Sequence, residues 1–305
     1  MEGLFGCKIF QNAGVRELIQ GLSDGAPMHV ETIRRTVLKN TAAMKGKQQI
    51  SAAQKTLEAL IQKRVLRQGI ELQCERCQRH CWYGLGEFAD DFKCKRCFQT
   101  QSVSMLGENP WHYVSDGLFT LPRKVAGCLT SAAALVCLQH FLHHDFKFVS
   151  SFEYSAGANQ AERDFAIFAS SVFRNDVDLI FGECKTSENL LSGGTSVGST
   201  GPPDLQQKEK DDMRDLGKRT GSYLAFCTFA ADFSDADKEF FREMVREKQK
   251  LILLTKTHLE MDYMAAGKFL GRSRGAPLRI VEQLSRLTTI DTLGNEFAMA
   301  NEIWI

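Results

Sequence analysis

The sequence predicts a mixed α/β protein in which helices and strands alternate over residues 121–305, after a helical segment and a small cysteine-rich module. The prediction depends on apolar periodicity that changes along the chain and on four cysteines that form two closely spaced pairs. A length of 305 residues is enough for about two domains. Because 43% of residues are apolar and 25% are charged, the composition excludes a disordered, collagenous or mainly membrane-embedded chain.

The first part, residues 1–72, is predicted to be a helical module with a basic surface. Helical spacing and alternation indicate three helices and one strand, at residues 14–22, 30–38, 51–62 and 65–72. Between Glu31 and Ile70 there are nine Lys or Arg and two Glu residues. The pattern fits a winged-helix module that binds nucleic acid, and it fits a helical cap with a solvated basic face equally well.

The second part, residues 73–120, contains two Cys-x2-Cys pairs separated by sixteen residues, Cys74 with Cys77 and Cys94 with Cys97. This spacing predicts a four-Cys zinc ribbon, since two facing turns supply four thiolates in a tetrahedron around Zn²⁺. With every position filled by protein, the zinc site is structural. Cys81 and His80 are competing ligands, but the paired spacing is satisfied without them. Basic and acidic side chains around the ribbon balance. The charge therefore does not distinguish a spacer from a module that contacts protein or binds nucleic acid.

The third part, residues 121–265, is predicted to have the element order αβββαβ, followed by a further helix and strand. The expected helices and strands cover residues 125–141, 147–154, 162–169, 177–185, 204–219, 222–228, 235–247, 250–255 and 257–265. Residues 191–203 are rich in Gly, Ser and Thr and are predicted to form a loop. Residues 266–305 are expected to be a tail that packs on this core.

Two of these strands are predicted to form an antiparallel hairpin that carries most of the charged residues of interest. With Asp164 opposite Glu183, the expected pairs are Phe168 with Leu179, Ala166 with Phe181 and Glu162 with Lys185. Because strand side chains alternate, Glu162, Asp164, Glu183 and Lys185 should emerge on one face. Three carboxylates and an ammonium among apolar neighbours are costly to desolvate, and a divalent cation or solvent would compensate them.

Such a cluster suits phosphodiester hydrolysis with Mg²⁺ or Mn²⁺. The carboxylates of Asp164 and Glu183, and the backbone carbonyl of Cys184, are hard oxygen ligands for the ion. Lys185 is predicted to orient or deprotonate the attacking water, or to neutralise charge on the phosphate. An ordinary ion pair between Glu183 and Lys185 at a sheet edge is the alternative.

The pattern Asp164, eighteen residues, Glu183-Cys184-Lys185 resembles the PD-(D/E)XK nuclease superfamily, in its Holliday-junction-resolvase and Mrr-like branch. The resemblance covers residues 125–256 and implies a restriction endonuclease-like core that cleaves DNA, less often RNA. Two features depart from the family pattern. The helix at 125–141 has no acidic residue, so Glu153 or Glu162 would have to substitute, and Arg163 stands where the family often has Pro.

We therefore expect a cytoplasmic, metal-dependent DNA endonuclease, by analogy one of genome defence or DNA processing. Cutting both strands with one site per chain suggests a homodimer, and a partner ATPase or helicase is a further expectation. No stretch reaches the ~18 apolar residues of a transmembrane helix, so no membrane association is expected. The alternative is a non-catalytic adaptor that binds nucleic acid or protein through the ribbon and winged helix, with the nuclease-like core as a scaffold.

Overall fold

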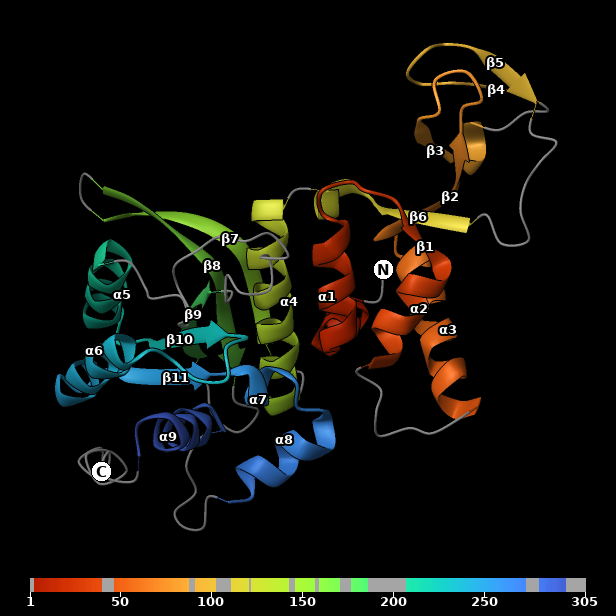
Figure 1. Cartoon of the computed structure of the whole chain (residues 1–305). Coiled ribbons are helices and arrows are strands. Elements are labelled where there is room, and N and C mark those ends of the chain that lie inside the picture. Colours follow the sequence, from red (N-terminus) through yellow and green to blue (C-terminus); the bar gives the residue numbers. More distant parts are fainter. Residues whose placement is uncertain are drawn as a thin grey trace. The chain divides into compact units, whose positions relative to one another are not determined.

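The computed structural model describes residues 3–39, 47–87, 91–102, 111–120, 122–142, 146–156, 159–170, 177–185, 207–272 and 280–294. These residues divide into two units (Figure 1). One unit combines residues 1–11 with residues 127–305, and the other comprises residues 12–126. Of the sequence predictions, the loop at 191–203 lies outside the described residues.

The unit of residues 12–126 begins with three helices, α1 (Ala13–Leu22), α2 (Val30–Lys39) and α3 (Lys47–Gln62). The side chain of Asn12 caps α1 by accepting hydrogen bonds from the first-turn amides. Leu18, Ile33 and Leu60, one from each helix, are fully buried. Each such side chain stabilises the fold by about 1.5–3 kcal/mol when it leaves water, so these apolar faces hold the three helices together.

An antiparallel sheet in the order β1-β6-β2-β3 completes this unit. Its strands are β1 (Met28–His29), β2 (Leu66–Gln73), β3 (His80–Gly84) and β6 (Trp111–Ser115). Strand β2 pairs with β6 along Leu66–Ile70 and with β3 along Gly69–Gln73. The cysteine-rich segment is therefore an insertion between β2 and β6, and β2 runs continuously into it.

The remaining elements of this unit are short. They are η2 (Leu85–Glu87), β4 (Asp91–Lys93), β5 (Thr100–Ser102) and η3 (Gly117–Thr120). Strands β4 and β5 pair as a separate two-stranded sheet. Together with β3 they carry the two cysteine turns.

The other unit is built on a five-stranded sheet in the order β11-β10-β9-β8-β7. The strands are β7 (Phe146–Ala156), β8 (Asn159–Ser170), β9 (Val177–Lys185), β10 (Tyr223–Thr228) and β11 (Lys250–Leu254). Strands β7, β8 and β9 are antiparallel neighbours, whereas β9, β10 and β11 are parallel. Parallel neighbours need a crossover connection, and the helices α5 (Gln207–Thr220) and α6 (Asp235–Arg246) supply one each.

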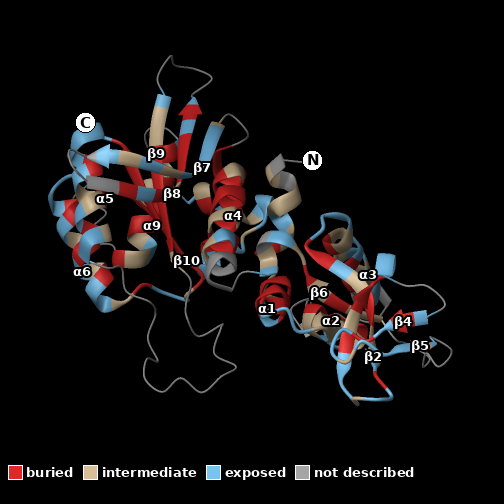
Figure 2. Cartoon of the chain, turned by 90° about the horizontal axis from the view of Figure 1, so that it is seen from above, coloured by how far each residue is buried: buried red, intermediate tan, exposed pale blue. Residues whose placement is uncertain are grey.

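Helices cover both faces of this sheet. They are η1 (Gly3–Gln11), α4 (Pro122–Leu142), α5 (Gln207–Thr220), α6 (Asp235–Arg246), α7 (Lys256–Leu259), α8 (Tyr263–Leu270) and α9 (Ile280–Leu293). Side chains such as Phe165 and Ala225 pack on α4, and the alternate positions Ala166 and Phe226 pack on α5 and α6. Figure 2 shows the buried positions concentrated along these central strands. Burial on both faces explains the apolar runs Leu224–Cys227 in β10 and Leu251–Leu254 in β11.

The observed elements follow the predicted order α4-β7-β8-β9-α5-β10, with α6 and β11 after it. Two regions differ from the prediction. The single helical turn expected at 257–265 is two helices, α7 and α8, separated at Asp262, whose side chain caps α8. The expected tail contains α9, which lies against β11 through a hydrogen bond from the Leu253 amide to Thr288. Within the described residues, no helix is both long and apolar enough to cross a lipid bilayer.

Candidate functional site

The four predicted zinc ligands lie together in the inserted segment. The sulfur atoms of Cys74, Cys77, Cys94 and Cys97 all lie within 4.8 Å of one another. The Cys74 and Cys97 sulfurs are 3.5 Å apart, and those of Cys77 and Cys94 are 3.7 Å apart. Zn–S bonds of ~2.3 Å in a tetrahedron require sulfur separations of about 3.8 Å. The four thiols therefore fit a Zn²⁺ ion closely.

The backbone around the thiols repeats in the two turns. The residue after each second cysteine, Gln78 or Phe98, has a positive φ of 55° or 61°, and its amide donates to the carbonyl of the first cysteine. The amides of Cys97 and Arg96 lower the pKa of the Cys94 thiol to about 6. Amides aimed at sulfur stabilise the thiolate, which is the form that binds metal.

The competing ligands weighed from the sequence do not join this group. The only set of metal-ligating side chains that converges in the described residues consists of the four paired cysteines. Cys81 is buried in the core of the ribbon beside Tyr83 and Phe92. His80 is exposed at the start of β3. The paired spacing therefore identified the correct four residues.

The predicted register of β8 against β9 is confirmed. Phe168 lies opposite Leu179, and Ala166 lies opposite Phe181. The ladder continues as far as Phe165 opposite Gly182. A Cβ atom at position 182 would lie only 2.0 Å from the Phe165 ring, so this close crossing requires glycine.

Beyond this pair the alternation of side chains changes, and Asp164 turns toward β9. Its Oδ2 accepts a hydrogen bond of 2.6 Å from the backbone amide of Cys184. On the neighbouring strand β7, Ser151 has a positive φ of 48°, a conformation that disturbs the regular pleat at this level. Asp164 thus lies beside the backbone that connects Glu183 to Lys185.

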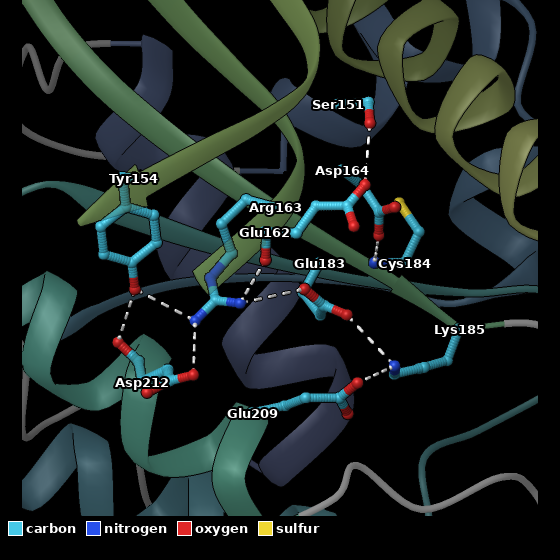
Figure 3. Close-up of polar contacts among 10 residues, drawn as sticks. All are labelled: Ser151, Tyr154, Glu162, Arg163, Asp164, Glu183, Cys184, Lys185, Glu209 and Asp212. Carbon is cyan, nitrogen blue, oxygen red and sulfur yellow. Dashed lines mark hydrogen bonds and ion pairs between the residues drawn. The ribbon is translucent and has the colours of Figure 1, made fainter. Parts of the chain in front are cut away.

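Glu183 is buried and faces two cations. Its Oε1 lies 3.1 Å from the ammonium of Lys185, and its Oε2 lies 3.7 Å from the guanidinium of Arg163 (Figure 3). Arg163 is itself only 3% exposed. The structure therefore brings together the predicted residues Asp164, Glu183 and Lys185, and it adds Arg163.

Helix α5 supplies two further carboxylates that the sequence analysis missed. Glu209 accepts a hydrogen bond of 2.5 Å from the Lys185 ammonium, and Asp212 lies 3.8 Å from the Arg163 guanidinium. The hydroxyl of Tyr154 on β7 also accepts from Arg163. A charged helix between β9 and β10 was predicted, but its orientation toward β9 has no signal in the sequence.

Glu162 does not join the group in the predicted way. Its carboxylate is exposed and accepts a hydrogen bond of 2.9 Å from the hydroxyl of Ser151. No Glu162–Lys185 pair occurs in the described ladder, because the altered alternation directs Arg163, not Glu162, toward Glu183. Cys184 contributes its amide to Asp164, and ligation of a metal by its carbonyl stays a prediction.

Burial is the largest cause of the pKa shifts of Glu183 and Asp164. It raises the pKa of Glu183 to about 7, with the nearby charge of Asp164 acting in the same direction, and it also raises the pKa of Asp164. The ammonium of Lys185 offsets only part of this effect on Glu183. For Lys185, burial opposes the charged form, but Glu183 and Glu209 outweigh it and raise the pKa of the ammonium.

The site has an excess of negative charge. Four carboxylates, those of Asp164, Glu183, Glu209 and Asp212, surround only two cations, Arg163 and Lys185. When both buried acids are ionised, two negative charges are uncompensated, and a divalent cation would offset them. The donor set of carboxylate oxygens suits Mg²⁺ or Mn²⁺. The chemistry of these donors suits the predicted ion, but in the described residues the carboxylate oxygens do not converge as the four thiols do.

Comparisons with known proteins identify no relative of this chain. No family model, curated protein or solved structure matches it. Any functional assignment thus depends on the geometry of the two sites described above.

Proposed function

We propose that this chain is a divalent-metal-dependent endonuclease that hydrolyses phosphodiester bonds in DNA, with a restriction endonuclease-like core of the PD-(D/E)XK type. The observation that carries the proposal is the meeting of Asp164, Glu183 and Lys185 at one end of the β8–β9 pair. Residues that come from two strands share a buried, acidic site that also holds one ammonium. The order α4-β7-β8-β9-α5-β10 also agrees with that core.

Each residue has a role that its contacts support. Asp164 and Glu183 would hold Mg²⁺ or Mn²⁺, which supplies a Lewis acid and lowers the pKa of a bound water. The Cys184 amide fixes the Asp164 carboxylate, and Arg163 fixes Glu183. Lys185, 28% exposed and held by Glu209, is placed to neutralise charge that develops on the scissile phosphate.

The other unit supports binding of nucleic acid. Its order α1-β1-α2-α3-β2-β6, with the sheet order β1-β6-β2, agrees with a winged helix in which the ribbon is inserted between the last two strands. The stretch of residues 31–70 that builds much of it is basic. We propose that this unit selects the DNA that the acidic site cuts.

The test is nicking of supercoiled plasmid by the full chain in Mg²⁺ or Mn²⁺. Wild type should relax the plasmid, and Glu183→Gln and Lys185→Ala should lose at least 100-fold in rate. Lys218→Ala is a matched control, because Lys218 is a half-exposed lysine of α5 that pairs with Glu247 away from the site. Equal nicking by wild type and both site variants would refute the nuclease proposal. Stable binding of DNA with no nicking in either metal would favour the non-catalytic adaptor.

A further inference from the structure

A hollow lined by basic side chains lies on the zinc ribbon, in a different part of the sequence from the acidic site. It has a volume of about 660 Å³ and is lined by Gln78, Arg79, His80 and Arg96. No carboxylate lines it. Two guanidiniums without a facing acid are a favourable arrangement for an anion, since each offers up to five N–H donors in a planar fork.

The two arginines differ from two other cations of the ribbon, Lys95 and Arg76. Lys95 is paired with Glu87 at 2.8 Å, and Arg76 donates to Gln99. Arg79 and Arg96 are exposed, and in the described part of the ribbon neither forms an ion pair. Their charges are therefore available to a ligand.

The cysteine turns hold both arginines in place. Arg96 stands between Cys94 and Cys97, and the carbonyl of Arg79 accepts a hydrogen bond of 3.0 Å from the Cys74 amide. The backbone at both positions is thus fixed by the four-thiol cluster. A rigid backbone lowers the entropy cost of presenting two guanidiniums to one ligand.

An exposed aromatic ring lies two residues after Arg96. Phe98 is 68% exposed, and the Lys93 ammonium lies 5.6 Å from its ring centroid. Its backbone has the positive φ of the second turn, so the ring position is fixed by the same turn that carries Arg96. An exposed ring beside cations suits stacking with an unpaired base.

We propose that the ribbon binds an unpaired segment of DNA, with the phosphate backbone on Arg79 and Arg96 and a base on Phe98. The inference rests on the proposed nuclease function and names its substrate class, DNA with a single-stranded region. Duplex DNA presents phosphates but no free base face, so it should bind this surface more weakly.

The experiment measures fluorescence anisotropy of a labelled 20-nucleotide single strand with the full-length, zinc-loaded chain. The chain carries Lys185→Ala, and no Mg²⁺ is added, so binding is read without cleavage. In this background Arg79→Gln with Arg96→Gln should weaken binding roughly tenfold. It should also make the slope of log affinity against log salt shallower by about 1.4, since each phosphate contact contributes ~0.7 for single strands.

Two further variants separate the contributions. Phe98→Ala should weaken binding of the single strand roughly tenfold, leave the salt slope unchanged and leave duplex binding unchanged. Lys218→Gln with Arg219→Gln removes two charges from exposed side chains of α5 and should have little effect. Zinc stoichiometry, measured for every variant, should stay at one per chain and shows that the ribbon has folded.

Three outcomes would overturn the inference. The first is equal affinity and slope in the Arg79/Arg96 variant and the α5 control. The second is an equal loss of single-strand and duplex affinity in Phe98→Ala. The third is displacement by millimolar inorganic phosphate at constant ionic strength, which would indicate a small-anion site. The nuclease proposal is judged separately. Loss of plasmid nicking in Glu183→Gln tests the acidic site, whereas the change in affinity caused by the Arg79, Arg96 and Phe98 substitutions tests the ribbon.

Discussion

The guanidinium of Arg163 lies 3.7 Å from the Glu183 carboxylate, and both side chains are buried. The same guanidinium donates to the Tyr154 hydroxyl and lies 3.8 Å from Asp212. One side chain therefore connects β7, β8, β9 and α5 at the acidic site. A buried cation of this kind limits the repulsion between Glu183 and its acidic neighbours.

Replacing Arg163 by Met should destabilise the metal-free chain by about 1–3 kcal/mol, because Glu183 keeps Lys185 but loses its second, buried cation. The same change increases the negative charge of the site. Added Mg²⁺ should therefore raise the melting temperature of Arg163→Met more than that of wild type. Thermal unfolding with and without Mg²⁺ measures both effects.

The matched control for this prediction is Arg242→Met. Arg242 pairs with Glu239 on an exposed part of α6, where an ion pair contributes little. An unchanged melting temperature in metal-free Arg163→Met would contradict a structural role for the buried ion pair.

The titration of Glu183 predicts how stability depends on pH. The folded chain holds this proton with a pKa of about 7, whereas the usual value is 4.5. Between these two pH values the folded state binds more protons than the unfolded state, so the free energy of unfolding falls as pH rises. The stabilisation is complete below pH 4.5 and lost above pH 7, and it amounts to about 3 kcal/mol.

Urea unfolding of the metal-free chain at pH 5, 6, 7 and 8 measures this slope, and Glu183→Gln should flatten it. Mg²⁺ requires the ionised carboxylate, so its stabilising effect should grow over the same range. An identical pH profile in wild type and Glu183→Gln would show that another group controls the slope.

Strands β8 and β9 show which features of the acidic site can be predicted from the sequence and which cannot. Their register was predicted correctly by placing Asp164 opposite Glu183, which sets Ala166 opposite Phe181. A shift of one residue would exchange the two faces. The regular alternation of strand side chains gave a wrong prediction for Glu162, which contacts Ser151 and not Lys185. The positive φ of Ser151 changes the pleat on the neighbouring strand, and no pattern of hydrophobic residues reports that change.

Long-range contributions were also hidden from the sequence. Glu209 reaches Lys185 from a helix that begins 22 residues later in the chain, so only the packing of Met213 and Leu216 on the sheet sets its direction. The four cysteines, in contrast, could be predicted from the sequence. Their ligands are local, and the spacing alone selected the correct four thiols.

Removal of zinc should unfold the ribbon. Cys77→Ser should lose bound zinc, whereas Cys81→Ala should retain it, because Cys81 lies in the ribbon core outside the thiol cluster. Metal analysis of the purified chains measures the zinc content. Trp82 on β3 reports the loss of structure by its fluorescence, since its indole N–H donates to the His112 carbonyl. Full zinc content in Cys77→Ser would exclude the four-thiolate site.

The crossing of Phe165 over Gly182 gives a prediction that tests the geometry of the acidic site without touching a charge. In Gly182→Ala the new methyl group would meet the Phe165 ring, and overpacking of this kind costs typically 1–3 kcal/mol. Gly267→Ala is the matched control, because its methyl group would enter open space on α8 and should stabilise that helix by about 1 kcal/mol. Urea unfolding of the two variants should therefore change in opposite directions. Combining Gly182→Ala with Phe165→Leu should recover part of the loss, since a smaller side chain makes room for the methyl group. If Gly182→Ala is as stable as wild type, Phe165 does not lie over β9, and the positions of Asp164 and Glu183 that follow from this crossing would be wrong.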